Sequence, residues 1–95
     1  AGKLPASKVL RQNASFFVRA VPAARRRARR HLEEAVRHAR AADTPGLLAQ
    51  GLADLGLLSK CAGQLEPARL FFEQARSIAE ELGAKKLIGR IDAAL

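Results

Sequence analysis

The sequence predicts an all-α fold of stacked antiparallel helical hairpins, with about five helices in one domain over residues 1–95. Small and apolar residues recur 40 positions apart, and a fixed period of this length is typical of stacked-repeat architectures. Between breaks marked by proline and glycine, apolar residues are spaced as on one face of a helix. No segment alternates with the period of two that a strand requires. The repeat-matched pairs are Ala28/Ala68, Leu32/Phe72, Ala35/Ala75, Ala39/Ala79, Leu47/Leu87 and Leu55/Leu95.

The first two expected helices, residues 6–21 and 23–42, form a degenerate hairpin over residues 6–42. Apolar spacings of four and seven predict the first helix, and Pro22 separates it from the second, because proline disfavours helix in the preceding residue. The second helix has one apolar stripe, made of Ala28, Leu32, Ala35, Val36 and Ala39. On its other side, oppositely charged residues four apart are expected to pair: Arg29/Glu33, Arg30/Glu34 and Glu33/Arg37.

A second hairpin is expected over residues 45–82, with helices over 45–62 and 66–82 joined by a turn at Gly63. Thr44 is expected to cap its first helix, with Pro45 at the first helical position. The buried side of that helix is predicted to contain Leu48, Leu52, Leu55, Leu58 and Ala62. A last helix over 84–95 either caps this hairpin or packs on a following helix. In the second case its apolar edge, Leu87, Ile91 and Leu95, is available to another copy of the chain.

Residues 49–82 resemble a tetratricopeptide repeat, a family marked by W-x2-L-G-x2-Y followed by A-x3-F. The matching residues are Leu52-x2-Leu55-Gly56-x2-Ser59, then Ala68-x3-Phe72 and Ala75. Leu52 and Ser59 depart from the pattern, because the family has tryptophan and tyrosine there. The resemblance implies a right-handed stack in which Gly56, Ala68 and Ala75 allow close helix contacts. The 40-residue period resembles the arrays of multidomain bacterial signalling proteins and ATPase-linked transcription regulators.

This resemblance implies a non-catalytic protein–protein interaction module within a larger signalling or regulatory protein, binding a peptide or protein segment. It places the partner-binding residues on the inner wall of the stack: Asn13, Phe17, Gln50, Ala53, Asp54, Leu57, Lys60 and Arg90. Some relatives bind a C-terminal carboxylate through lysine and asparagine at set positions. Asp54 stands where they have asparagine, so this specificity is not transferred.

The net charge of +8 favours acidic partners. Its strongest local source is the helix over residues 23–42, with a basic patch of Arg25, Arg26, Arg29, Arg30 and Arg37. Two interpretations stay open. The patch is a solvated outer face or contacts an acidic protein domain, or it binds nucleic-acid phosphates. The second interpretation lacks the interleaved aromatic residues that single strands stack on.

Nothing in the sequence predicts an enzyme, a metal or a cofactor. His31 and His38 are two helical turns, about 10 Å, apart, too far for one zinc ion. We expect His31 to have a packing role and Cys61 to be a small buried residue. A single cysteine fits a reducing, cytoplasmic compartment. No stretch reaches the roughly 20 apolar residues that cross a membrane.

Overall fold

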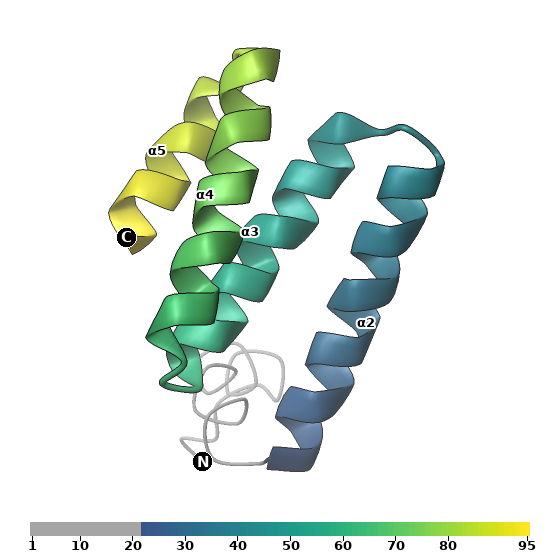
Figure 1. Cartoon of the computed structure of the whole chain (residues 1–95), viewed down its shortest axis with the longest axis vertical. Helices are drawn as coiled ribbons and strands as arrows, with labels where there is room; N and C mark the ends of the chain where they lie inside the picture. The colour runs from purple at the N-terminus through teal and green to yellow at the C-terminus, as the bar shows by residue number, and fades with distance from the viewer. Residues whose placement is uncertain (1–21) are drawn as a thin grey trace, which may run out of the picture.

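Four helices make up residues 22–95, the part of the chain that the computed structural model describes. They are α2 (Pro22–Ala41), α3 (Pro45–Cys61), α4 (Leu65–Leu82) and α5 (Lys85–Ala94). Consecutive helices run antiparallel (Figure 1), and no strand occurs among these residues. The all-α class is therefore confirmed, and the four helices match their expected ranges to within one residue at each end. The helix expected over residues 6–21, with Asn13 and Phe17, lies outside the described residues.

The turns between the helices follow the expected chemistry with one exception. Gly63 and Gly83 have φ angles of 78° and 67°, a left-handed conformation that glycine adopts without a steric penalty. Pro45 lies in the first turn of α3, as predicted. The prediction that Thr44 caps this helix is wrong. Its hydroxyl instead donates a hydrogen bond to the Ala39 carbonyl at 3.1 Å, because the last carbonyls of α2 have no partner within their own helix.

Helix α3 is central, since it contacts each of the other three helices. The contact between α3 and α4 is the most extensive, and α5 touches both of these helices. Side chains from these three helices form one buried cluster, made of Leu52, Ala53, Ala68, Phe72, Ala75 and Ile91. Burial of this apolar surface is the main force that holds α3, α4 and α5 together.

Close packing of α3 on α4 depends on Gly56. A Cβ atom at this position would lie 2.8 Å from the Phe72 ring, so the ring rests directly on the glycine backbone. Ala68 and Ala75 are buried on the same side of α4. The predicted close approach at these small residues is confirmed. Gly51 makes a similar contact on the other side of α3, where a Cβ would lie 2.8 Å from a Val36 methyl group.

Helix α5 covers one end of the buried cluster. Ile91 is buried and Leu87 packs against the cluster, whereas Leu95 is exposed. Arg76 of α4 donates hydrogen bonds to both carboxylate oxygens of Asp92, at 2.8 and 3.3 Å. This hydrogen bonding lowers the pKa of Asp92 below its usual value. The interaction ties α5 to α4 at the surface.

Three burial predictions are wrong. Ala35 and His31 are exposed, because among the described helices α2 has a neighbour only in α3. Cys61 is also exposed, because it follows Leu52 by nine positions and so lies half a turn away from the buried side of α3. Helices α2 to α5 are each too short or too polar to span a bilayer.

Candidate functional site

Several residues predicted to line an inner wall make hydrogen bonds that link α3 and α5. Arg90 donates a hydrogen bond to the Gln50 side-chain oxygen at 3.4 Å, and the Gln50 amide donates to Asp54 at 3.3 Å. The Lys60 ammonium donates to the Ala94 carbonyl near the end of α5. The structure therefore brings these predicted residues to one side of the molecule, but it also uses their polar groups in contacts with one another.

This wall has little room for a ligand. Leu57 and Arg90 line a hollow of only about 50 Å³ between α3 and α5. A second hollow, of about 200 Å³, lies beside Lys60 and is bounded by Leu65 and Leu95. Ligand sites usually measure several hundred Å³, so the wall is a shallow surface.

A larger groove lies between α2 and α4. These two helices both pack on α3, but their backbones do not approach each other, so α3 forms the floor between them. One hollow of about 470 Å³ extends from Arg29 to Arg40, and a second of about 540 Å³ continues towards Ile78. The two hollows share Arg40, Leu52 and Gln74. We call this combined hollow the α2–α4 groove.

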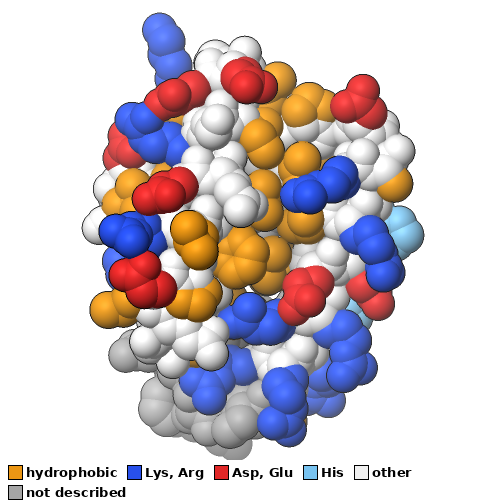
Figure 2. Space-filling model, in the orientation of Figure 1, with side chains coloured by type: hydrophobic (Ala, Val, Ile, Leu, Met, Phe, Trp, Pro, Cys, Tyr) orange, Lys and Arg blue, Asp and Glu red, His pale blue; other side chains and the backbone are white. Residues whose placement is uncertain are grey.

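The α2–α4 groove has an apolar interior. Leu52 and Leu55 form its floor, Val36 contributes from α2, and Phe71 and Ile78 contribute from α4. The three wall residues are half-buried, so part of their apolar surface faces solvent. Figure 2 shows these hydrophobic side chains gathered between α4 and α2. An exposed apolar surface with a polar rim marks a site for another molecule.

The two rims of the α2–α4 groove differ in charge. The α2 rim carries Arg29, Arg37 and Arg40, with a single carboxylate, Glu33. The α4 rim carries Glu73, Gln74 and Ser77. One edge is therefore basic and the other neutral to acidic.

At the lower end of this groove the arginines form a separate hollow of about 220 Å³, which we call the arginine pocket. It is lined by Arg25, Arg26, Arg29 and Gln64, together with Leu58 and Ala62. Nη2 of Arg29 donates to the fully buried Ser59 hydroxyl at 3.3 Å and to the Gln64 side-chain oxygen at 3.0 Å. Arg29 thus joins α2 to the end of α3 and the beginning of α4.

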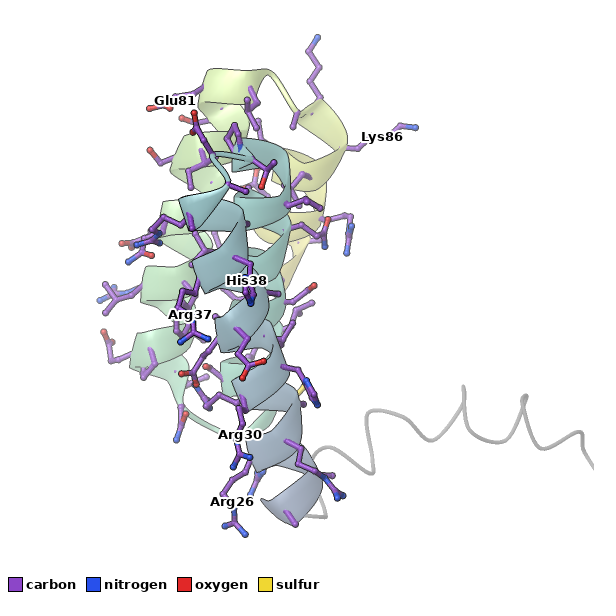
Figure 3. The ribbon with its side chains drawn as sticks, turned by 90° about the vertical axis from the view of Figure 1, so that its right-hand side faces the viewer. Arg26, Arg30, Arg37, His38, Glu81 and Lys86 are labelled. Atoms are coloured by element: carbon purple, nitrogen blue, oxygen red, sulfur yellow. The ribbon has the colours of Figure 1, made fainter. Side chains whose placement is uncertain are left out.

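The expected ion pairs along α2 are wrong. Within residues 22–95 the recorded ion pairs are made by Arg69 and Arg76 of α4, and none involves an α2 arginine. Arg29 bonds to neutral partners on other helices instead of to Glu33. Arg26, Arg30 and Arg37 project from one side of α2, the first two about one turn apart and the last two about two turns apart, with His38 beside Arg37 (Figure 3).

Sequence reasoning missed Ser59, Gln64 and the groove itself. The available signal was that Val36, Phe71 and Ile78 are apolar residues outside the repeat-matched positions of their helices. These residues pack only partly against the buried cluster, so the rest of each side chain can face a third element.

Among the described residues no group of three histidine, cysteine or acidic side chains is placed to hold a metal ion. No protein-family model, curated protein or solved structure matches the chain.

Proposed function

We propose that this chain is a non-catalytic protein-interaction module whose α2–α4 groove binds an amphipathic helical segment of another protein. The observation that carries the proposal is the half-buried apolar surface of Val36, Phe71 and Ile78, which faces solvent between two helices whose backbones stay apart. An amphipathic helix laid in such a groove buries apolar residues at positions i, i+3, i+4 and i+7.

The charges of the rims set the orientation of the ligand about its own axis. Arg29, Arg37 and Arg40 favour a ligand edge that carries carboxylates, because opposite charges across an interface raise the association rate and fix the register. The α4 rim, with Glu73, favours a neutral or basic edge. The ligand is thus an amphipathic helix with an acidic edge facing α2.

We also propose that the hairpins stack as in the tetratricopeptide family, within a larger regulatory protein. The contact of Phe72 with Gly56 and the burial of Ala68 and Ala75 support this arrangement. The inner wall around Gln50 and Asp54, where that family places ligands, is the competing location for the partner.

A display library of helical peptides selected on residues 1–95 tests the proposal. We expect selected ligands to have apolar residues with helical spacing. Phe71→Glu should lower their affinity by tenfold or more, about 1.4 kcal/mol. Leu70→Glu is the matched control, because Leu70 is the exposed neighbour of Phe71 on α4 and does not line the groove. Circular dichroism checks that both variants fold.

The competing wall predicts the opposite pattern. Ligands that are weakened by Leu57→Glu but not by Phe71→Glu would move the binding surface to α3 and α5. A failure to select any ligand with apolar residues at helical spacing would contradict the groove itself.

Nucleic acid is the second candidate ligand, favoured by the row of Arg26, Arg30 and Arg37 along α2 (Figure 3). Among the described residues this row has no exposed aromatic partner, since Phe71 faces the groove and Phe72 is buried. We expect a mixed-sequence duplex to bind weakly at about 0.15 M salt, because phosphate contacts alone are strongly screened. Tight duplex binding that survives Phe71→Glu and falls steeply with salt would replace the proposed function.

A further inference from the structure

The α2–α4 groove changes character along its length. Arg29 lines both the apolar hollow and the arginine pocket, so the two adjoin each other at this side chain. From Ile78 down to Leu55 the interior is apolar, and beyond Arg29 the lining becomes Arg25, Arg26 and Gln64. In Figure 2 the arginine and lysine side chains gather at the lower end of the molecule, where α2 begins. A ligand that fills the whole groove therefore meets two kinds of surface.

The positive charge at this end is not balanced within the chain. Nine lysines and arginines precede Glu33, the first carboxylate of the sequence. From Glu33 onward the eight remaining cations are matched by nine carboxylates. The net charge of the protein is thus concentrated in its first third. Residues 1–21 contribute four of these cations and no carboxylate.

The position of the pocket adds to its affinity for anions. It lies at the N-terminal ends of α2 and α4, because Arg25 and Arg26 are in the first turns of α2 and Gln64 immediately precedes α4. The C-terminal end of α3, at Ala62, also borders the pocket, so two helix N-termini are set against one C-terminus. The first turn of α2 has no acidic residue. The partial positive charge of a helix N-terminus disfavours arginines and favours a bound anion. An incoming carboxylate relieves this repulsion.

The side chain of Arg29 is already held in place and can still bind a carboxylate. Both of its recorded hydrogen bonds use Nη2, which leaves Nε and Nη1 without a partner among the described residues. An arginine fixed by neutral partners keeps its full charge and loses less side-chain entropy when it binds a carboxylate.

We infer that the α2–α4 groove recognises a segment with a defined polarity: an apolar helical stretch followed by a cluster of aspartates or glutamates. The acidic cluster occupies the arginine pocket, and the apolar stretch lies over Leu52 and Leu55. The inference rests on the proposed function and adds the chemistry of the ligand's end and its direction in the groove. A protein segment is favoured over nucleic acid because Leu58 and Ala62 contribute apolar surface to the pocket itself.

Two synthetic peptides test the inference on residues 1–95. Both contain the same amphipathic stretch of about 18 residues, roughly 27 Å as a helix. One ends in a run of glutamates and the other in a run of glutamines. We expect the acidic peptide to bind about tenfold more tightly at about 0.15 M salt, since hydrogen bonds to charged groups are the stronger kind. A nitroxide on the glutamate end should broaden the NMR signals of Gln64 and not those of Ser77.

Matched double variants separate the pocket from general charge. Arg25→Gln with Arg26→Gln should abolish the advantage of the acidic peptide and leave the glutamine peptide unchanged. Lys85→Gln with Lys86→Gln removes the same charge at the opposite end of the molecule, where Lys86 lies in Figure 3, and should preserve the advantage. Equal losses in both double variants would overturn the inference.

The remaining outcomes distinguish the two proposals. If neither peptide binds while a short glutamate oligomer still shifts the Gln64 signals, the groove proposal fails and the acidic-ligand pocket stands. If both peptides bind equally and both lose affinity in Phe71→Glu, the groove stands and the inferred polarity is overturned. Tighter binding of a mixed-sequence duplex than of the acidic peptide would assign the pocket to nucleic acid.

Discussion

Helices α2 and α4 have the same pattern of small and apolar residues, yet they are buried to different extents. In α4 the four repeat-matched residues are all buried: Ala68, Phe72, Ala75 and Ala79. In α2 only the last of the four is buried, two are half-buried and one is exposed; in chain order they are Ala28, Leu32, Ala35 and Ala39. The difference comes from neighbours, because α4 packs between α3 and α5, whereas α2 contacts only α3 among the described helices.

The two helices also differ in whether their arginines form ion pairs. The two arginines of α4 form ion pairs with carboxylates on α4 and α5. The seven arginines of α2 form none among the described residues. Helix α4 is therefore packed on two sides and has its arginines paired, whereas the arginines of α2 have no ion-pair partner among the described residues. Equivalent residues are thus fully packed in one helix and partly exposed in the other.

The largest expected effect on stability comes from truncating the side chains of the repeat-matched residues Phe72 and Leu32. Phe72→Ala should destabilise the protein by about 3–5 kcal/mol, because it leaves a cavity against Gly56. Leu32→Ala should cost clearly less, below about 2 kcal/mol, because Leu32 is only half-buried. Urea unfolding followed by circular dichroism measures both values. Equal costs would mean that α2 is as fully packed as α4.

A second test enlarges the matched alanines. Ala75→Leu should cost about 1–3 kcal/mol, because a fully buried alanine leaves no space for a larger side chain. Ala35→Leu should change stability by less than about 0.5 kcal/mol, because this position faces solvent. Thermal unfolding of the two variants provides the comparison. Strong destabilisation by Ala35→Leu would reveal a packing partner for that side of α2.

The smallest expected effect is on the stability of the protein at acidic pH. The hydrogen bond from Arg76 lowers the pKa of Asp92 in the folded state, so this carboxylate stabilises the fold above its unfolded pKa. That contribution is lost as the pH falls through the lowered folded value, below about pH 4. The stability difference between wild type and Asp92→Asn should therefore shrink as the pH falls below about 4.

The matched variant for this test is Arg29→Gln. Arg29 bonds to Ser59 and Gln64, which do not titrate, so the effect of its replacement should be constant over the same pH interval. Urea unfolding at a series of pH values checks both. An Arg29→Gln effect that disappears in acid would point to a carboxylate partner for Arg29.

The candidate site was predictable only in part. The inner-wall residues Gln50, Asp54 and Arg90 do lie together, because they occupy one side of helices whose register the sequence reveals. The α2–α4 groove was not predicted, because it depends on the gap between two helices that are separated in the chain by α3. The partners of Arg29 on α3 and at the beginning of α4, Ser59 and Gln64, were missed for the same reason.

By itself the sequence determined where each described helix begins and ends, which residues α3 and α4 bury together, and how unevenly charge is distributed. These properties follow from apolar spacing, proline and glycine at the turns, and the identity of each residue, all of which act locally. Only the tertiary structure decided that Ala35 is exposed and that Arg29 spans three elements. Burial and long-range hydrogen bonds depend on which neighbour is present, and no local pattern specifies a neighbour that is distant in the chain.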